Sequence, residues 1–176
     1  MANGLVRAYA LFMALLPSLN PRIIEALYAE ALGLAEAVRA RFERLRQDIA
    51  GSHDETGDGD LRRVQVSCEA LRTTTRVMHC LAWLLNHRAH FAGELSELQL
   101  RRHGRLIANF PASDAALVAG LPDDVQALVH ESERLYERIQ RLELAWRAQP
   151  AAGGAGAVER LRERLARSIG EAPSAA

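Results

Sequence analysis

The chain has 176 residues with 22 basic and 22 acidic side chains, so its formal net charge is zero and no overall field attracts it to nucleic acid. All 22 basic residues are arginines, which excludes Schiff-base catalysis and lysine-dependent phosphate binding. The length fits one domain with a substantial core, and few aromatic residues (5%) beside many leucines and alanines favour helices packed on helices.

Residues 1–20 form an apolar extension ahead of the first clear helix signal. The stretch from Leu5 to Leu16 resembles the core of a signal peptide, but it is too short to span a membrane. The sequence after Pro17 is not a small-residue cleavage site. An additional helix or a wrongly assigned start, with Met13 as one alternative, is the favoured interpretation. A signal sequence and a peripheral anchor stay open as alternatives.

Three stretches carry apolar or small residues at alternating three- and four-residue steps. The first run is Ile24, Tyr28, Ala31, Ala35, Val38, Phe42, Leu45 and Ile49. The second run is Leu61, Val64, Cys68, Leu71, Thr75, Met78, Ala82, Leu85 and Ala89. The third run is Val125, Leu128, Ser132, Leu135, Ile139, Leu142 and Trp146. A period of about 3.5 residues keeps one seam facing a partner helix, so the three runs predict bundled helices.

Capping residues mark the ends of the first two helices. Asn20 followed by Pro21 is typical of a helix start, so a helix is predicted over residues 21–49. Asp60 can cap the next helix, and Gly93 ends it after residue 92. This second helix is nearly 50 Å long at about 1.5 Å per residue, whereas a compact globule of this size is about 40 Å across. The bundle is therefore predicted to be elongated.

The second half of the chain begins with a capping box. Ser96 and Gln99 provide it and open a short helix that is predicted to reach about residue 109. A loop over residues 111–120 has room for one helical turn. Pro122 and the two aspartates after it then start the last long helix, which is predicted to end near residue 147.

These elements predict an all-α fold, an elongated antiparallel bundle of three long helices plus a short connecting helix. The bundle domain covers residues 21–147, and residues 148–176 are predicted to be a Gly/Ala linker and a flexible C-terminal tail. A brief amphipathic stretch in that tail consists of Val158, Leu161, Leu165 and Ile169. A dozen residues are marginal as an isolated helix in water.

Residues 77–85 are apolar nearly all round the predicted helix, and only His79 interrupts them. A helix in a three-helix bundle needs an apolar stripe on one side only. The favoured explanation is that a second copy of the chain covers the additional apolar surface, so a homodimer is predicted. The alternative is that the short helix and the N-terminal segment cover that face.

A polar stripe lies beside the apolar run on the same predicted helix. Its members follow one another at steps of three or four residues and are Arg72, Arg76, His79, Trp83, His87 and His90. Arginine and tryptophan on an accessible face are typical of binding hot spots. The stripe is therefore the candidate protein-binding site, and the alternative is a solvated arginine face with a half-buried tryptophan.

Metal sites are disfavoured by the ligand spacing. His87 and His90 have Cys80 two turns earlier, but no fourth ligand converges from this helix. The acidic loop that begins at Asp54 resembles a calcium loop, yet its twelfth position is Gln65 where a bidentate glutamate is needed. No metal and no other cofactor is expected.

Enzymatic and nucleic-acid functions also lack their motifs, because the sequence has no GxSxG, no glycine-rich phosphate loop and no HExxH. A phosphotransfer histidine needs a basic residue one turn on and a small neighbour. The histidines without that surrounding are His79, His87, His103 and His130. Arg101, Arg102 and Arg105 lack aromatic interleaving and are weak grounds for nucleic-acid binding. Cys68 and Cys80 form no CxxC and are expected to be reduced thiols in a cytoplasmic protein.

Three segments resemble the RcdA family of alphaproteobacterial proteins, which was first catalogued as a domain of unknown function. Residues 67–78 (SCEALRTTTRVM), continuing through 82–85 (AWLL) to 87–89 (HRA), resemble its central helix and are the distinctive part. Residues 27–32 (LYAEAL) and 132–139 (SERLYERI) resemble its first and last helices. The resemblance covers roughly residues 22–146 in the same order.

The resemblance implies a dimeric helical bundle with a mobile tail and no catalytic activity. RcdA-like proteins are adaptors that join the ClpXP protease once a response regulator has primed it. They tether substrates, among them a cell-cycle transcription factor, directly or through a second-messenger-binding adaptor. A non-enzymatic proteolytic adaptor is therefore the predicted function. A helical dimerisation or scaffold module without a protease role is the main alternative, ahead of a phosphotransfer or metal-dependent enzyme.

Overall fold

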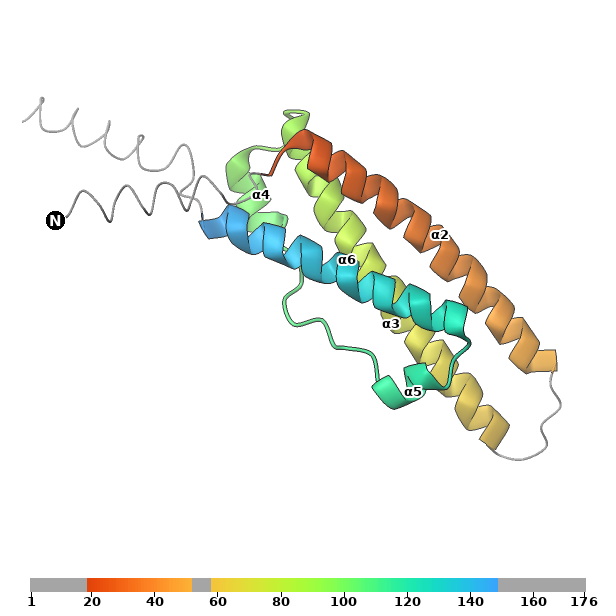
Figure 1. The fold of residues 1–176 in the computed structure, drawn as a ribbon. Coiled ribbons are helices and arrows are strands. Elements are labelled where there is room, and N and C mark those ends of the chain that lie inside the picture. The colour runs from red at the N-terminus through yellow and green to blue at the C-terminus, as the bar shows by residue number, and fades with distance from the viewer. Residues whose placement is uncertain (1–18, 52–57, 149–176) are drawn as a thin grey trace, which may run out of the picture.

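Three long helices, α2 (Pro21–Gly51), α3 (Asp58–Phe91) and α6 (Asp123–Ala148), lie side by side as an elongated bundle (Figure 1). The computed structural model describes residues 19–51 and 58–148. Two short helices, α4 (Glu97–His103) and α5 (Ala115–Ala119), lie in the segment that connects α3 to α6. The described residues contain helices and no strands, so the predicted all-α fold is confirmed.

The direction of each long helix follows from the contacts between them. Arg88 of α3 pairs with Glu25 and Arg138 of α6 pairs with Glu30, so α2 runs antiparallel to both helices. Arg76 and His87 of α3, in contrast, contact Ser132 and Trp146 of α6 in the same order along the chain. Helices α3 and α6 are therefore parallel, because the segment between them runs back along the bundle (Figure 1).

The predicted helix ends are confirmed at most positions. Oδ1 of Asn20 accepts the Ile23 N–H over 3.0 Å, and Gly93 ends α3 with a φ of 80°. Ser96 and Gln99 form the predicted capping box. The short helix ends at His103, earlier than predicted, because Gly104 turns the chain against Leu100 so tightly that a Cβ there would lie 2.5 Å from Leu100 Cδ1.

The seams predicted for α2 and α6 form the core. From α2 the buried members are Ile24, Ala31, Val38, Phe42 and Leu45, and from α6 they are Val125, Ser132, Leu135 and Ile139. The remaining members of these two runs are partly buried. The 3.5-residue period therefore identified the inner faces of both helices correctly.

The seam predicted for α3 is on the wrong side of the helix. Its large members Leu61, Leu71 and Met78 are exposed. The buried face of α3 is instead a mixed one, made of Val66, Glu69, Thr73, Arg76, Val77, Cys80, Leu81, Trp83, Leu84 and His87. Polar residues can face the interior here because the neighbouring elements supply hydrogen-bond partners, as described below.

Three groups of predictions lie outside the described residues, namely those on residues 1–18, those on the acidic loop over residues 52–57 and those on the linker and tail from residue 149 onward. Within residues 19–51 and 58–148, no helix combines the length and the apolar character that a membrane span requires. The expected burial of residues 77–85 on more than one side is wrong for the single chain, since Val77, Cys80, Leu81, Trp83 and Leu84 are buried on one side of α3 while Met78 and Leu85 on the other side are exposed.

Candidate functional site

The six residues predicted as a binding stripe do not form an accessible face. Trp83 and His87 are each 1% exposed and Arg76 is 2% exposed. Arg72, His79 and His90 are half-buried. The prediction of an accessible stripe is therefore wrong for Arg76, Trp83 and His87, because their spacing is that of the core-facing side of α3.

Arg76 is the centre of a buried polar network between α3, α6 and the loop before α5. Its Nη1 donates to Ser132 Oγ over 2.7 Å, and its Nη2 donates to Ser113 Oγ over 3.1 Å and to the Pro111 carbonyl over 3.4 Å. Glu133 adds an ion pair at 3.5 Å. Burial lowers the pKa of Arg76, and the carboxylates nearby oppose that change.

Glu69 carries the balancing negative charge and is fully buried. Its carboxylate accepts hydrogen bonds from Arg72 Nη1 at 2.5 Å, Ser113 Oγ at 2.6 Å and Thr73 Oγ1 at 3.2 Å. Ser113 thus bridges Glu69 and Arg76. The network holds the connecting loop against the bundle, and its charged groups form hydrogen bonds and ion pairs within the chain.

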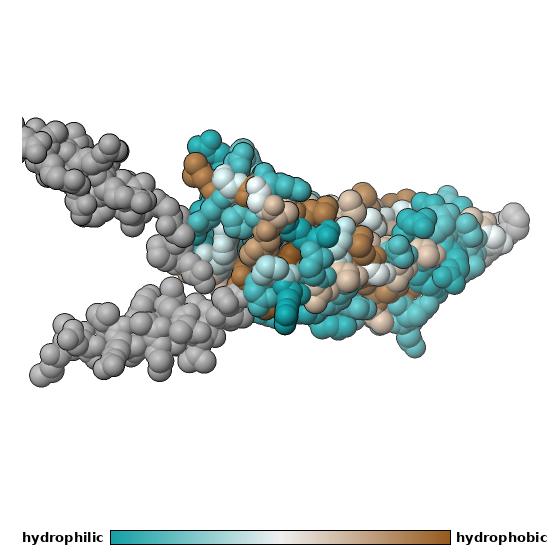
Figure 2. Space-filling view, turned by 90° about the horizontal axis from the view of Figure 1, so that it is seen from above, coloured by the Kyte–Doolittle hydropathy of each residue, from teal (hydrophilic) through white to brown (hydrophobic). Residues whose placement is uncertain are grey.

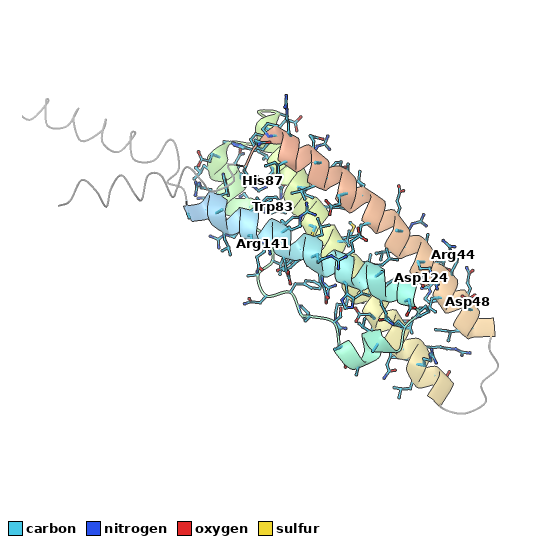
Figure 3. All side chains as sticks on the ribbon, viewed as in Figure 1. Arg44, Asp48, Trp83, His87, Asp124 and Arg141 are labelled. Carbon is cyan, nitrogen blue, oxygen red and sulfur yellow. The ribbon has the colours of Figure 1, made fainter. Side chains whose placement is uncertain are left out.

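Trp83 and His87 form a second buried cluster, which Figure 3 places at the end of the bundle near α4. The ring centroids of Trp83 and His87 are 3.8 Å apart, and the His87 ring meets the edge of Trp146 at 5.3 Å. Nδ1 of His87 lies 3.0 Å from the Trp83 carbonyl oxygen, so Nδ1 carries the proton of the neutral ring. Arg147 lies nearby and, with His90, opposes protonation of the ring.

Burial lowers the pKa of His87 from 6.5 to about 4 and predicts a pH-dependent stability. Between these two values the unfolded chain binds a proton that the folded chain does not. The contribution of His87 is fully present above pH 6.5 and is lost as the pH falls toward 4, at a slope of up to about 1.4 kcal/mol per pH unit. Urea unfolding of the wild type and of His87→Gln between pH 7 and pH 4 measures this slope.

Carboxylates also titrate between pH 7 and pH 4. The slopes of stability against pH are therefore compared, rather than the absolute free energies of unfolding. The His87→Gln chain should lose less stability per pH unit than the wild type, because it lacks the group whose protonation favours the unfolded state. Parallel curves for the two proteins would contradict the neutral, buried state assigned to His87.

The half-buried members of the predicted stripe also have partners within the chain. The His79 ring meets the Phe110 ring edge at 5.3 Å, and His90 Nδ1 lies 2.9 Å from the Leu95 carbonyl oxygen. Arg72 pairs with Glu69. The six residues that were predicted as a binding stripe therefore hold α3 against the connecting segment and α6.

The opposite side of α3 presents apolar side chains to solvent. We call this surface the α3 stripe, and it consists of Leu61, Val64, Cys68, Leu71, Thr75, Met78, Ala82, Leu85 and Ala89. Leu71 is 70% exposed and Met78 is 55% exposed, while Thr75 and Ala89 are partly exposed. Figure 2 shows patches of apolar surface among hydrophilic surface on one face of the bundle, seen from above. The α3 stripe is the stronger candidate for a protein-binding surface.

A hollow of about 690 Å³ lies at the C-terminal end of the α3 stripe. Leu85, Ala89 and Phe91 provide apolar lining. Charged side chains also line it, namely Glu25, Arg88 and Glu94, and Arg88 Nε donates to Glu25 Oε1 over 2.7 Å. The α3 stripe therefore ends at a hollow that is lined by both apolar and charged side chains.

The described residues offer little for chemistry of another kind. Within residues 19–51 and 58–148, no group of three or more histidine, cysteine, aspartate or glutamate side chains could hold a metal ion. Both cysteines are free; Cys68 is exposed and Cys80 is buried. Burial raises the pKa of the Cys80 thiol to about 12, so this side chain stays protonated and unreactive.

A comparison with protein-family models gives a match over most of the chain. A family model described as "Protein of unknown function (DUF1465)" matches residues 16–169. Neither the curated proteins nor the solved structures contain a match to this chain. The matched range takes in the whole described bundle and excludes most of the apolar N-terminal extension.

Proposed function

This chain belongs to the DUF1465 family of proteins of unknown function, and from that premise we propose that it is a homodimeric, non-enzymatic adaptor in regulated proteolysis. Following the RcdA family that the sequence resembles, it tethers substrates to a ClpXP protease primed by a response regulator, in the cytoplasm. A cell-cycle transcription factor is the substrate class, bound directly or through a second-messenger-binding adaptor.

The observation that carries the homodimeric part of the proposal is the α3 stripe, and the adaptor role rests on the resemblance of residues 67–78 to the RcdA family. A helix that displays apolar side chains over most of its length is suited to binding another protein, and larger apolar patches on soluble proteins mark interaction sites. An adaptor needs surfaces of this kind and no chemistry, because raising the local concentration of a substrate at the protease is enough to speed its degradation. The distinctive RcdA-like segment, residues 67–78, includes Leu71 and Met78 of this stripe.

The second copy in the homodimer is assigned to the α3 stripe, which gives a mutational prediction. Leu71→Glu or Met78→Glu should convert the dimer to a monomer, because each places a charge in the middle of an apolar contact. Both side chains are exposed in the single chain, so its fold should be retained. Sedimentation equilibrium and far-UV circular dichroism measure the two properties on the same samples.

Leu144→Glu is the matched control, because Leu144 is an equally exposed leucine (64%) on α6, away from the stripe. It should leave the mass unchanged. A wild-type monomer, or a dimer that survives both stripe variants, would remove the α3 stripe from the proposed assembly.

The adaptor function is tested by reconstituted degradation. ClpXP, its priming response regulator and a candidate cell-cycle substrate are combined with and without this protein, and substrate turnover is followed. Faster turnover that requires both the regulator and this protein is expected. The Leu71→Glu chain tests whether dimerisation is needed, and deletion of residues 150–176 tests whether the tail delivers substrate.

A folded, dimeric protein that leaves turnover unchanged would overturn the adaptor proposal. It would favour the alternative, a helical dimerisation or scaffold module. Deletion of residues 150–176 would then also leave substrate turnover unchanged. The partner would be sought by capturing proteins that bind to the folded dimer.

A further inference from the structure

We infer that the amphipathic segment of the C-terminal tail, residues 158–169, docks into the hollow at the C-terminal end of α3 of its own chain. The segment lies outside the described residues, whereas the hollow lies within them. The inference concerns a single chain, so it goes beyond the proposed adaptor function and does not depend on it. A dozen residues are marginal as an isolated helix, and packing against a neighbouring surface supplies the stability that such a segment lacks.

The chain leaves the described bundle beside the hollow. Near the end of α6, Trp146 contacts His87 on the inner side of the last turns of α3, with 5.3 Å between the ring centroids. The hollow lies on the outer side of these turns, because its lining residue Leu85 is exposed whereas His87 is buried. A path from one side to the other crosses one helix diameter, about 10–12 Å with side chains. The nine residues 149–157 can span about 30 Å, so they reach the hollow from Ala148.

The hollow and the segment match in apolar spacing and in length. On the outer side of α3, small or apolar residues follow one another at steps of three or four and are Ala82, Leu85, Ala89 and Ala92. The apolar residues of the segment have the same steps and are Val158, Leu161, Leu165 and Ile169. Each row rises about 15–16 Å along its helix, so the two can lie against each other over their full length. The alanines on either side of Leu85 have small side chains, which allow a second helix to come close.

The charges of the two surfaces also suit each other. Arg88 in the lining of the hollow is paired with Glu25. Glu94, in contrast, is exposed and has no ion-pair partner among the described residues. Residues 158–169 carry four arginines and two glutamates, which is a surplus of positive charge. One of these arginines can therefore pair with Glu94 when the segment is docked.

The extent of the family match supports a role for the segment. The match continues past the end of α6 at Ala148 and stops at Ile169, the last apolar residue of the segment. Gly170 follows directly, as is typical of the end of a helix. The linker and the segment therefore belong to the length that the family shares and are not an addition to this chain.

Attachment to the bundle makes even a weak contact effective. A short linker keeps the segment near the hollow at an effective concentration in the millimolar range. An affinity too weak to hold two separate molecules together is then sufficient to keep the segment docked. The docked segment covers the end of the α3 stripe from Ala82 onward, so the part from Leu61 to Met78 stays available to a second copy.

Hydrogen–deuterium exchange of the full chain tests the docking directly. The backbone amides of residues 161–169 should exchange about tenfold more slowly than those of an unstructured peptide. Leu85→Glu places a charge in the hollow and Leu165→Glu places one in the segment, so each should return these amides to the unprotected rate. Leu61→Glu is the matched control and should leave the protection unchanged. Leu61 is a similarly exposed leucine (55% against 47% for Leu85) at the other end of the α3 stripe.

Unprotected amides at residues 161–169 of the wild type would overturn the inference. Protection that survives both Leu85→Glu and Leu165→Glu would overturn it too, as would an equal loss in Leu61→Glu. Circular dichroism confirms that the bundle is folded in each variant.

A monomeric chain shows whether the segment docks on its own copy. That chain is the wild type if it does not dimerise, and otherwise the Met78→Glu variant. Protection should persist in it, and protection that is lost on monomerisation would place the segment on a second copy and contradict the inference. Substrate turnover is measured separately, so a protein whose tail docks without any effect on turnover keeps this inference and loses the adaptor function.

Discussion

Replacing Trp83 with alanine is expected to lower the free energy of unfolding by about 3–5 kcal/mol. The side chain is 1% exposed and is stacked on His87, so its removal deletes a large apolar contact and leaves a cavity between α3 and α6. Urea unfolding followed by circular dichroism measures the loss, at one fixed protein concentration because association between chains changes the apparent stability of a protein.

Leu144→Ala is the control for Trp83→Ala, since Leu144 is 64% exposed on α6 and its removal should change stability by no more than about 0.5 kcal/mol. A Trp83→Ala chain as stable as this control would mean that the tryptophan is not part of the core. Trp83 would then return to the candidates for a partner-binding surface.

Replacing Arg76 with alanine should be of similar severity, at about 3–5 kcal/mol, because it removes a buried charge that holds Ser132, Ser113 and the Pro111 carbonyl and pairs with Glu133. Glu69 would keep its negative charge in the interior, and Ser132 and the Pro111 carbonyl would lose their donor. Arg76→Lys should recover only part of the loss, since one ammonium cannot reproduce the spread of the guanidinium over three partners. Urea unfolding of the two variants gives the comparison.

Two further variants separate the effect of the lost charge on stability from the effect of the lost packing. Arg72→Ala removes the more exposed partner of Glu69 and should cost about 1 kcal/mol. The double variant Arg76→Met with Glu69→Leu should be more stable than Arg76→Ala alone, because no unpaired charge is left in the interior. A single Arg76→Ala variant with stability near that of Arg72→Ala would contradict the network.

The parts of the fold that the sequence predicted are those governed by local rules. Asn20, Gly93 and the capping box at Ser96 act on their own neighbours in the chain, and the structure has them where they were expected. The seams of α2 and α6 were also correct, since both helices have one apolar face and one core to bury it against.

The inner face of α3 could not be predicted in this way, because the helix has two candidate faces. The more apolar one, with Leu71 and Met78, points outward, and the one that contains Glu69 and Arg76 points inward. The choice depends on Ser113 and Ser132, which are distant in sequence and supply the hydrogen bonds that make the polar face tolerable. An arginine seven residues from a glutamate on one helix face was the available signal, but Arg76 was assigned to an accessible protein-binding stripe instead.

The parallel course of α3 and α6 has a consequence for where the chain enters and leaves the bundle. Because the connecting segment runs back along the bundle, α2 begins and α6 ends at the same pole of each copy (Figure 1). The chain therefore enters the described bundle before α2 and leaves it after α6 at one and the same pole. A protein fused before Leu19 or after Ala148 would be attached at this pole and would leave the opposite pole, where α2 ends and α3 begins, uncovered.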